Sequence, residues 1–91
     1  MPIARAHIYV AGYVQGVFYR HTMAQRARDR DLTGWVRNLP DGRVEAVLEG
    51  EESDVRDVVD WARSGPAHAT VEDVAVEWQQ PESGFSGFRI L

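Results

Sequence analysis

Apolar and polar residues alternate along several short stretches of the chain. This period-two pattern is typical of strands that bury one face. The stretches are residues 4–10, 35–39, 43–49, 74–78 and 88–90. Pro40, Asp41 and Gly42 join the second and third stretches, and Gly42 can take the positive φ that closes a hairpin. The pattern therefore predicts five strands, two of them in a hairpin.

Two helices are predicted between the strands. Apolar residues fall at i, i+3, i+4 and i+7 in the second helix, at Val55, Val58, Val59 and Ala62. Ser53 is the expected N-cap, and Gly65 followed by Pro66 is the expected stop. The first helix is predicted over residues 21–31, which are rich in Met, Ala, Gln and Arg, although its apolar stripe is thin.

The predicted order is β-α-β-β-α-β with a further short strand at the end. This order matches the α+β, ferredoxin-like split βαβ sandwich, an antiparallel sheet with both helices on one face. With 91 residues the chain suits one domain, which we expect over residues 1–91. A ferredoxin-like fold does not by itself specify a function.

Composition excludes several kinds of chemistry. The chain has no Cys and no Lys, which excludes thiol nucleophiles, thiolate metal sites and amine catalysis. Its three His residues show no metal-ligand spacing. A net charge of −4 argues against nucleic acid and anionic membranes as partners. The apolar runs are too short to cross a membrane and none resembles a signal peptide, so we expect a cytoplasmic protein.

The segment GYVQGVFYR, residues 12–20, lies where the first strand gives way to the first helix. Unpaired backbone N–H groups at such a position attract anions. Gly12 and Gly16 allow a tight bend, and Arg20 adds a planar set of donors suited to phosphate oxygens. Judged from residue chemistry alone, a glycine-rich connection with a surface Arg is the favoured interpretation, because the spacing fits no common nucleotide motif.

The segment GWVRNLPDGRVEAVLEG, residues 34–50, contains the hairpin, with Asn38 just before its turn. An isolated Asn there commonly bonds nearby backbone and eases the chain into the turn. A carboxamide also offers a donor and an acceptor together, so Asn38 could hold a water molecule in one orientation.

Both segments, in this order and at this separation, resemble the two signature regions of the acylphosphatase family. The matching residues of the first are Gly12, Val14, Gln15, Gly16, Val17 and Arg20. Those of the second are Gly34, Trp35, Asn38, Gly42, Val44 and Gly50. The resemblance covers the whole chain, and the family's ferredoxin-like fold agrees with the predicted element order.

The resemblance implies hydrolysis of a small-molecule acyl phosphate by a monomeric enzyme that uses no metal and no cofactor. It implies that Arg20 and backbone amides bind the phosphoryl oxygens, and that Asn38 orients a water for in-line attack without a covalent intermediate. The amides belong to Gln15, Gly16, Val17, Phe18, Tyr19 and Arg20. The substrate's own phosphate would accept the water proton, since His21 and Asp41 are the nearby titratable residues.

The chain departs from the family at Met23, where a Thr is common, and at Arg30-Asp31, where Leu-Gly is common. These changes put the start of the first helix and its C-terminal stop in doubt, the stop because Asp is a poorer left-handed terminator than Gly, and they could lower local stability slightly. The main alternative function is a non-catalytic module that binds phosphate or acyl phosphate. A detached relative of the similar domain in larger carbamoyl-transfer maturation proteins is a further alternative.

The remaining residues have structural interpretations. Glutamates at 49, 51 and 52 are expected at the start of the second helix, where negative charge is favourable. The aromatic residues are expected mainly in the core. They are Trp35, Trp61, Trp78, Phe85 and Phe88.

Overall fold

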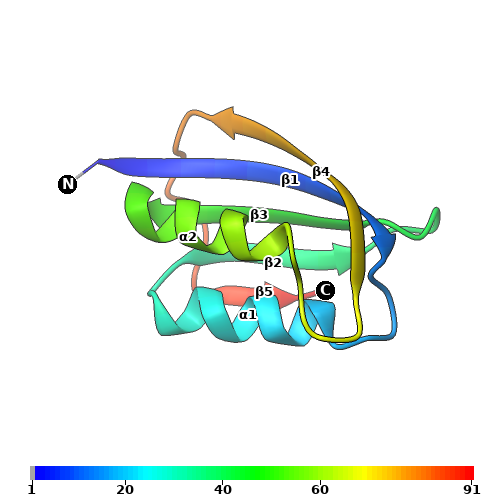
Figure 1. Ribbon diagram of the computed structural model, residues 1–91. Helices are drawn as coiled ribbons and strands as arrows, with labels where there is room; N and C mark the ends of the chain where they lie inside the picture. Colours follow the sequence, from blue (N-terminus) through cyan, green and yellow to red (C-terminus); the bar gives the residue numbers. More distant parts are fainter. Residues whose placement is uncertain (1) are drawn as a thin grey trace.

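The computed structural model describes residues 2–91, which form two α-helices and one five-stranded sheet (Figure 1). The strands are β1 (Ile3–Tyr13), β2 (Thr33–Asn38), β3 (Val44–Glu51), β4 (Thr70–Gln79) and β5 (Phe88–Ile90). The helices are α1 (Tyr19–Asp29) and α2 (Glu52–Ala62). Neither helix in the described residues is long and apolar enough to cross a membrane.

The sheet has the strand order β4-β1-β3-β2-β5, and both helices lie on one of its faces (Figure 1). Neighbouring strands are antiparallel, except that β5 runs parallel to β2. The ferredoxin-like fold is therefore confirmed. Because β1 and β2 are both antiparallel to β3, they run in the same direction and end at the same edge of the sheet.

The core lies between the helices and the inner face of the sheet. Alternation in β1 and β3 turns small and branched side chains toward the helices. Those that are fully buried are Ala6, Ile8, Val10, Val44, Ala46 and Leu48. The thin stripe predicted for α1 is also buried, at Met23, Ala24 and Ala27, and Tyr19 adds to it. Short alanine side chains let α1 approach the sheet closely.

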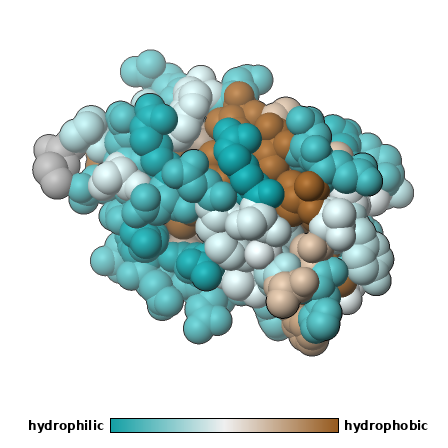
Figure 2. Space-filling view, in the orientation of Figure 1, coloured by the Kyte–Doolittle hydropathy of each residue, from teal (hydrophilic) through white to brown (hydrophobic). Residues whose placement is uncertain are grey.

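Helix α1 packs over β2 and β5, and α2 packs over β1 and β3, so β4 has the least cover. Its inward valines are only half-buried, and Figure 2 shows apolar surface (brown) in this part of the molecule. Trp35 and Phe85, also expected in the core, lie outside it beneath the guanidinium groups of Arg37 and Arg5. The expectation that Trp78 packs in the core is wrong because β4 has little cover. Its side chain is 43% exposed and stacks under the Arg56 guanidinium, 4.7 Å from the ring centre.

Strand β1 is longer than the alternation predicts, because it continues through Gly12 to Tyr13. The register shifts between Ala11 and Gly12, and Gly12 has a φ of 129°. A Cβ at this position would collide with the Thr70 carbonyl of β4. The absence of a side chain at Gly12 therefore permits close pairing of β1 with β4, and only the residues after Tyr13 form the connecting loop.

The N-cap predicted at Ser53 is wrong. Strand β3 runs directly into α2, so the N-cap is Glu51 and Ser53 lies in the first turn. The Ser53 hydroxyl donates to the Glu51 carboxylate at 3.2 Å, and the Glu52 N–H donates to the Pro2 carbonyl at 3.0 Å. The Pro2 carbonyl thus accepts a hydrogen bond from a helix N–H group, a role that a capping side chain would otherwise have.

Helix α1 ends in a Schellman motif despite the lack of Gly. Asp31 takes the left-handed conformation, with a φ of 57°. Its N–H donates to the Arg28 carbonyl at 3.1 Å, and the Leu32 N–H donates to the Ala27 carbonyl at 2.9 Å. Burial of Leu32 accompanies these two bonds, so tertiary packing keeps Asp31 in an unfavourable conformation.

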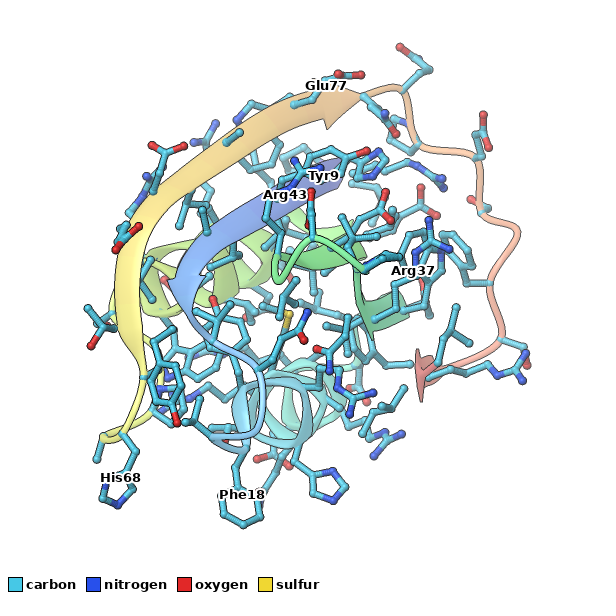
Figure 3. The ribbon with its side chains drawn as sticks, turned by 90° about the vertical axis from the view of Figure 1, so that its right-hand side faces the viewer. Tyr9, Phe18, Arg37, Arg43, His68 and Glu77 are labelled. Atoms are coloured by element: carbon cyan, nitrogen blue, oxygen red, sulfur yellow. The ribbon has the colours of Figure 1, made fainter. Side chains whose placement is uncertain are left out.

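Two carboxylates are buried on the face of the sheet that the helices leave open. Glu45 lies 2.6 Å from His7 Nε2 and accepts a hydrogen bond from Arg37 Nε at 2.7 Å. Burial alone would raise the pKa of the Glu45 carboxyl, but hydrogen bonds from His7, Arg37 and Tyr9 outweigh burial and hold that pKa below its ordinary value. Arg43 covers the same region, 5.0 Å over the Tyr9 ring (Figure 3).

Glu49 is the second buried carboxylate, and its expected place at the start of α2 is wrong. It pairs with Arg5 across the sheet, on the face away from the helices. Its oxygens accept hydrogen bonds from the N–H groups of Glu82 and Ser83, both at 2.8 Å. Glu49 therefore anchors the segment that leads from β4 to β5.

Asp31→Gly should raise the free energy of unfolding by about 0.5–1 kcal/mol, because Gly takes the left-handed conformation without steric cost. Urea denaturation measures the change. The control is Gln25→Gly at an exposed position in the middle of α1, which should lower the free energy of unfolding by roughly 0.5–1 kcal/mol. Equal effects of the two substitutions would contradict the left-handed conformation of Asp31 at the end of α1.

Glu45→Gln should lower the free energy of unfolding by about 2 kcal/mol at pH 7, since it removes a charge with buried hydrogen bonds. A carboxyl group with a lowered folded pKa stabilises the fold above its unfolded pKa, and this contribution is lost as pH falls through the folded pKa. The difference from wild type should therefore shrink below about pH 4.3. Urea denaturation over a pH series tests this, with the exposed Glu72→Gln as control. If the difference in free energy of unfolding between wild type and Glu45→Gln stayed constant with pH, the stabilising role of the Glu45 charge would be refuted.

Candidate functional site

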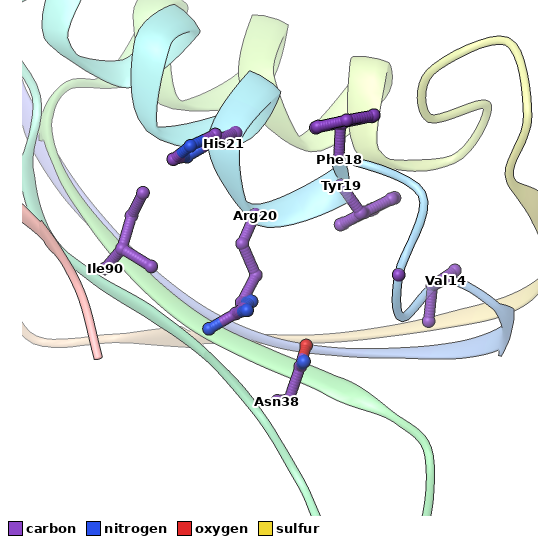
Figure 4. Close-up of a pocket in the computed structure, with 8 residues that line it drawn as sticks. Val14, Phe18, Tyr19, Arg20, His21, Asn38 and Ile90 are labelled. Atoms are coloured by element: carbon purple, nitrogen blue, oxygen red, sulfur yellow. The ribbon is translucent and has the colours of Figure 1, made fainter.

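A cavity of about 300 Å³ lies at the sheet edge where β1 and β2 end (Figure 4). It is lined by Val14, Gly16, Phe18, Tyr19, Arg20, His21, Asn38 and Ile90. Residues from the segments 12–20 and 34–50 therefore meet in one place. The βαβ topology explains this, because parallel β1 and β2 end at the same edge although β3 lies between them.

The β1–α1 loop (residues 14–18) is held by packing at both ends. Val14 and Val17 are buried, and Gly16 between them takes a φ of 76°. Phe18 is also left-handed, with a φ of 64°, yet its side chain is 75% exposed. Figure 3 shows it extending from the molecule into solvent. The buried valines and the two left-handed residues thus bend the loop tightly just before α1.

The bend leaves backbone donors without partners. Within residues 2–91, no carbonyl or side chain accepts a hydrogen bond from the N–H groups of residues 15–21. The first bond of the helix runs from the Thr22 N–H to the Phe18 carbonyl, at 3.0 Å. Unpaired N–H groups at a helix start carry partial positive charge and bind anions.

Tyr19 fixes the start of α1 from the opposite side. Its side chain is buried, and its hydroxyl donates to the Ala62 carbonyl at the end of α2, at 2.7 Å. Burial raises the pKa of the Tyr19 phenol well above its ordinary value, so the group stays a neutral donor. The first turn of α1 is thereby attached to the second helix.

Arg20 extends from the first turn of α1 into the cavity, toward Asn38 (Figure 4). One of its terminal nitrogens donates to the Leu91 carbonyl oxygen at 3.1 Å. No other group in the described chain accepts a hydrogen bond from this guanidinium. Its remaining N–H groups are available to a ligand in the cavity, beside the unpaired backbone donors.

Asn38 is the last residue of β2 and faces the helices, opposite Val44 of β3. Its Oδ1 atom is buried and has no hydrogen-bond partner among residues 2–91. Buried polar atoms normally have a partner, so an unpaired acceptor beside a cavity indicates a ligand or an ordered water.

The turn next to Asn38 does not use the Asn38 side chain. The side-chain hydrogen bonds within the turn come from Asp41, whose carboxylate accepts from the Arg43 N–H at 3.1 Å and from Arg43 Nε at 2.7 Å. These hydrogen bonds, the backbone one first, hold the pKa of Asp41 below its ordinary value. The interpretation of Asn38 as a turn residue is therefore wrong, and Asp41 has that role.

The structure separates the other predicted site residues into two groups. Gly16, Phe18 and Tyr19 line the cavity with Arg20 and Asn38. Gln15 and Val17 do not line it. The Val17 side chain is buried, and the Gln15 side chain turns to the β2–β3 hairpin, where it donates to two carbonyls.

Val14 and Ile90 also line the cavity, although the sequence did not predict either of them there. Ile90 reaches it because β5 pairs in parallel with β2, opposite Val36, and no pattern in the sequence gives that register. His21, which the sequence places near the site, does line the cavity, whereas Asp41 does not. In the part of the chain that the structure describes, no three His, Asp or Glu side chains gather as a metal site would need.

Comparison with known proteins identifies the family. The family model for acylphosphatases matches residues 6–90. The acylphosphatase of Roseiflexus sp. (strain RS-1) is 52% identical over 91 residues, which cover all of this chain and 98% of the relative. That of Nostoc sp. (strain PCC 7120) is 53% identical over 88 residues, with coverage of 97% and 86%.

Solved structures agree with these relatives. The acylphosphatase from Bacillus subtilis superposes with a TM-score of 0.92 at 35% identity, and covers 97% of this chain and 98% of its own. The Coxiella burnetii acylphosphatase gives a TM-score of 0.91 at 38% identity, with coverage of 98% and 93%. Full-length HypF, at 22% identity and 12% of its own chain, shares the fold alone. Given the matched family model, the full-length relatives and the shared fold, this chain belongs to the acylphosphatase family.

Proposed function

We propose that this chain hydrolyses the carboxyl-phosphate bond of small acyl phosphates, with Arg20 and backbone amides holding the phosphoryl group and Asn38 holding the attacking water. The observation that carries the proposal is the buried, unpaired Oδ1 of Asn38 beside a cavity that also contains the Arg20 guanidinium. The Arg20 guanidinium is suited to bind an anion, and the Asn38 Oδ1 atom is suited to accept a hydrogen bond from a neutral donor.

The phosphoryl group binds at the start of α1. Its oxygens accept hydrogen bonds from the N–H groups of residues 15–20, which have no acceptor within the described chain. The guanidinium of Arg20 adds a full positive charge and planar donors. Because these groups are fixed before the substrate arrives, they stabilise the charge that builds up on the phosphoryl oxygens during the reaction.

Asn38 orients the water. Its Oδ1 accepts a hydrogen bond from the water, which leaves a lone pair of the water oxygen directed at phosphorus. As the new P–O bond forms, the bond from phosphorus to the carboxyl oxygen breaks, and its electron pair leaves with the carboxylate. The water proton passes to a phosphoryl oxygen, so the products are a carboxylate and inorganic phosphate. Asp41 takes no part, since Arg43 already engages it.

The leaving group explains why so few residues suffice. A carboxylate is the conjugate base of an acid with a pKa of about 4, so it departs without protonation. An alkoxide is far more basic and requires a general acid or a metal ion. Catalysis is then a matter of positioning and charge stabilisation.

The alternative of a non-catalytic module that binds acyl phosphate is less consistent with Asn38. A fully ionised phosphate ester or acyl phosphate offers only acceptor oxygens, and so it cannot satisfy the buried Oδ1. Water can. Metal independence, a monomeric state and a cytoplasmic location stay predictions from the sequence.

Arg20→Ala and Asn38→Ala should have different effects. Each should lower turnover of benzoyl phosphate by at least about a hundredfold, the scale for one lost transition-state donor. Arg20→Ala should also weaken competitive inhibition by inorganic phosphate at least about tenfold, while Asn38→Ala should change it less than about threefold, because, of these two side chains, only that of Arg20 contacts the anion.

The control for lost charge is Arg26→Ala, from the same helix but outside the cavity, which should retain turnover. Turnover of Asn38→Ala close to that of wild type would exclude Asn38 as the residue that holds the water. Turnover of Arg20→Ala close to that of wild type would exclude Arg20 as a residue that stabilises the phosphoryl group in the reaction.

Turnover should depend on the leaving group. In the presence of a chelator, benzoyl phosphate should be hydrolysed rapidly, p-nitrophenyl phosphate slowly and an alkyl phosphate hardly at all, following the basicity of the group expelled. Steady-state rates on the three substrates test this. Equal rates on the alkyl ester and the acyl phosphate would refute the proposed chemistry.

A further inference from the structure

The side chain of Gln15 connects the β1–α1 loop to the β2–β3 hairpin. Its Nε2 atom donates to the Leu39 carbonyl at 2.8 Å and to the Arg43 carbonyl at 3.0 Å. A carboxamide nitrogen has two hydrogens, and each is used here. Gln15 is the one residue of the loop with a polar side chain.

The two acceptors lie on opposite sides of the hairpin turn. Leu39 directly follows the end of β2, and Arg43 directly precedes β3. The Leu39 N–H also donates to the Arg43 carbonyl at 2.8 Å, and the Gly42 N–H donates to the Leu39 carbonyl at 3.1 Å. Gln15 therefore adds a second donor to each carbonyl and holds both strand ends at once.

This contact is adjacent to Asn38. Leu39 is the next residue in the chain, while the Asn38 Oδ1 atom itself has no partner among residues 2–91. The phosphate-binding side of the site is fixed independently, because Tyr19 attaches the start of α1 to Ala62. The Gln15 side chain thus sets where the end of β2 lies relative to the start of α1.

We infer that Gln15 is a positioning residue that fixes the distance between the bound phosphoryl group and the water held by Asn38. This inference rests on the proposed function. It assigns to the side chain a role separate from that of the Gln15 backbone N–H in anion binding. Reaction rates depend steeply on the separation of the reacting atoms, and a displacement of about 1 Å can cost about a hundredfold.

The first test is Gln15→Met, which keeps the length of the side chain and removes both donors. Its kcat on benzoyl phosphate should fall at least about tenfold, while inhibition by inorganic phosphate should change less than about threefold. Unchanged kcat would overturn the inference, and so would a loss of phosphate affinity as large as the loss of kcat. The matched control is Gln79→Met, because Gln79 bonds Arg5 and Glu77 on the far face of the sheet and its loss should leave kcat unchanged.

A double-mutant cycle separates positioning from general damage to the fold. If Gln15 acts through Asn38, adding Gln15→Met to Asn38→Ala should lower kcat by less than about twofold more. If the double variant lost kcat by the product of the losses of the two single variants, the inference would be overturned. A normal rate for Asn38→Ala would instead reject the proposed function, whereas a slow Asn38→Ala with a normal Gln15→Met would reject only this inference.

A measurement on the wild-type protein does not depend on whether Gln15→Met folds. The side-chain NH₂ protons of Gln15 should exchange with solvent at least about tenfold more slowly than those of the exposed Gln25, as measured by NMR. Equal exchange rates for the two side chains would show that the Gln15 bonds do not persist in solution, and would overturn the inference.

Discussion

The site depends on the burial of three side chains, Val14, Val17 and Tyr19, around the start of α1. Each buried side chain of this size contributes about 1.5–3 kcal/mol relative to exposure. Their burial fixes the loop in a bend in which consecutive N–H groups have no acceptor within residues 2–91. Apolar packing thus offsets the cost of leaving polar groups without protein partners. The result is a positively polarised surface that exists before any anion binds.

The fold brings a second element to this surface through the direction of its strands. Strand β3 separates β1 from β2, so the loop after β1 and the end of β2 are not neighbours in the sheet. They meet because both strands run the same way and α1 crosses from one to the other over the inner face. Asn38 faces inward in this register, and a shift of one residue would turn it to the open face. The register of a single strand pair therefore determines whether the proposed water site exists.

Several residues in and near the site are in unfavourable states. Phe18 and Asp31, at the two ends of α1, are left-handed without being glycine, and the Asn38 acceptor is buried without a partner. Such features persist when the surrounding packing determines the conformation, and they concentrate at functional sites. Asp31 lies away from the cavity and improves no feature of it, which is why its replacement by Gly is expected to add stability. Phe18 and Asn38, in contrast, line the cavity in which we propose that the substrate binds.

The sequence by itself determined the element order, the helix-facing residues of the strands and the two segments that form the site, because these follow from local periodicity and from motif spacing. It did not determine the role of single polar side chains. Ser53 is no cap, Glu49 is buried beneath Arg5, and Gln15 bonds the hairpin, since each depends on partners far away in the chain. Only the tertiary structure decided these roles, because the partner of a hydrogen-bonding group is set by which distant segment the packed sheet and helices place within about 3 Å of it.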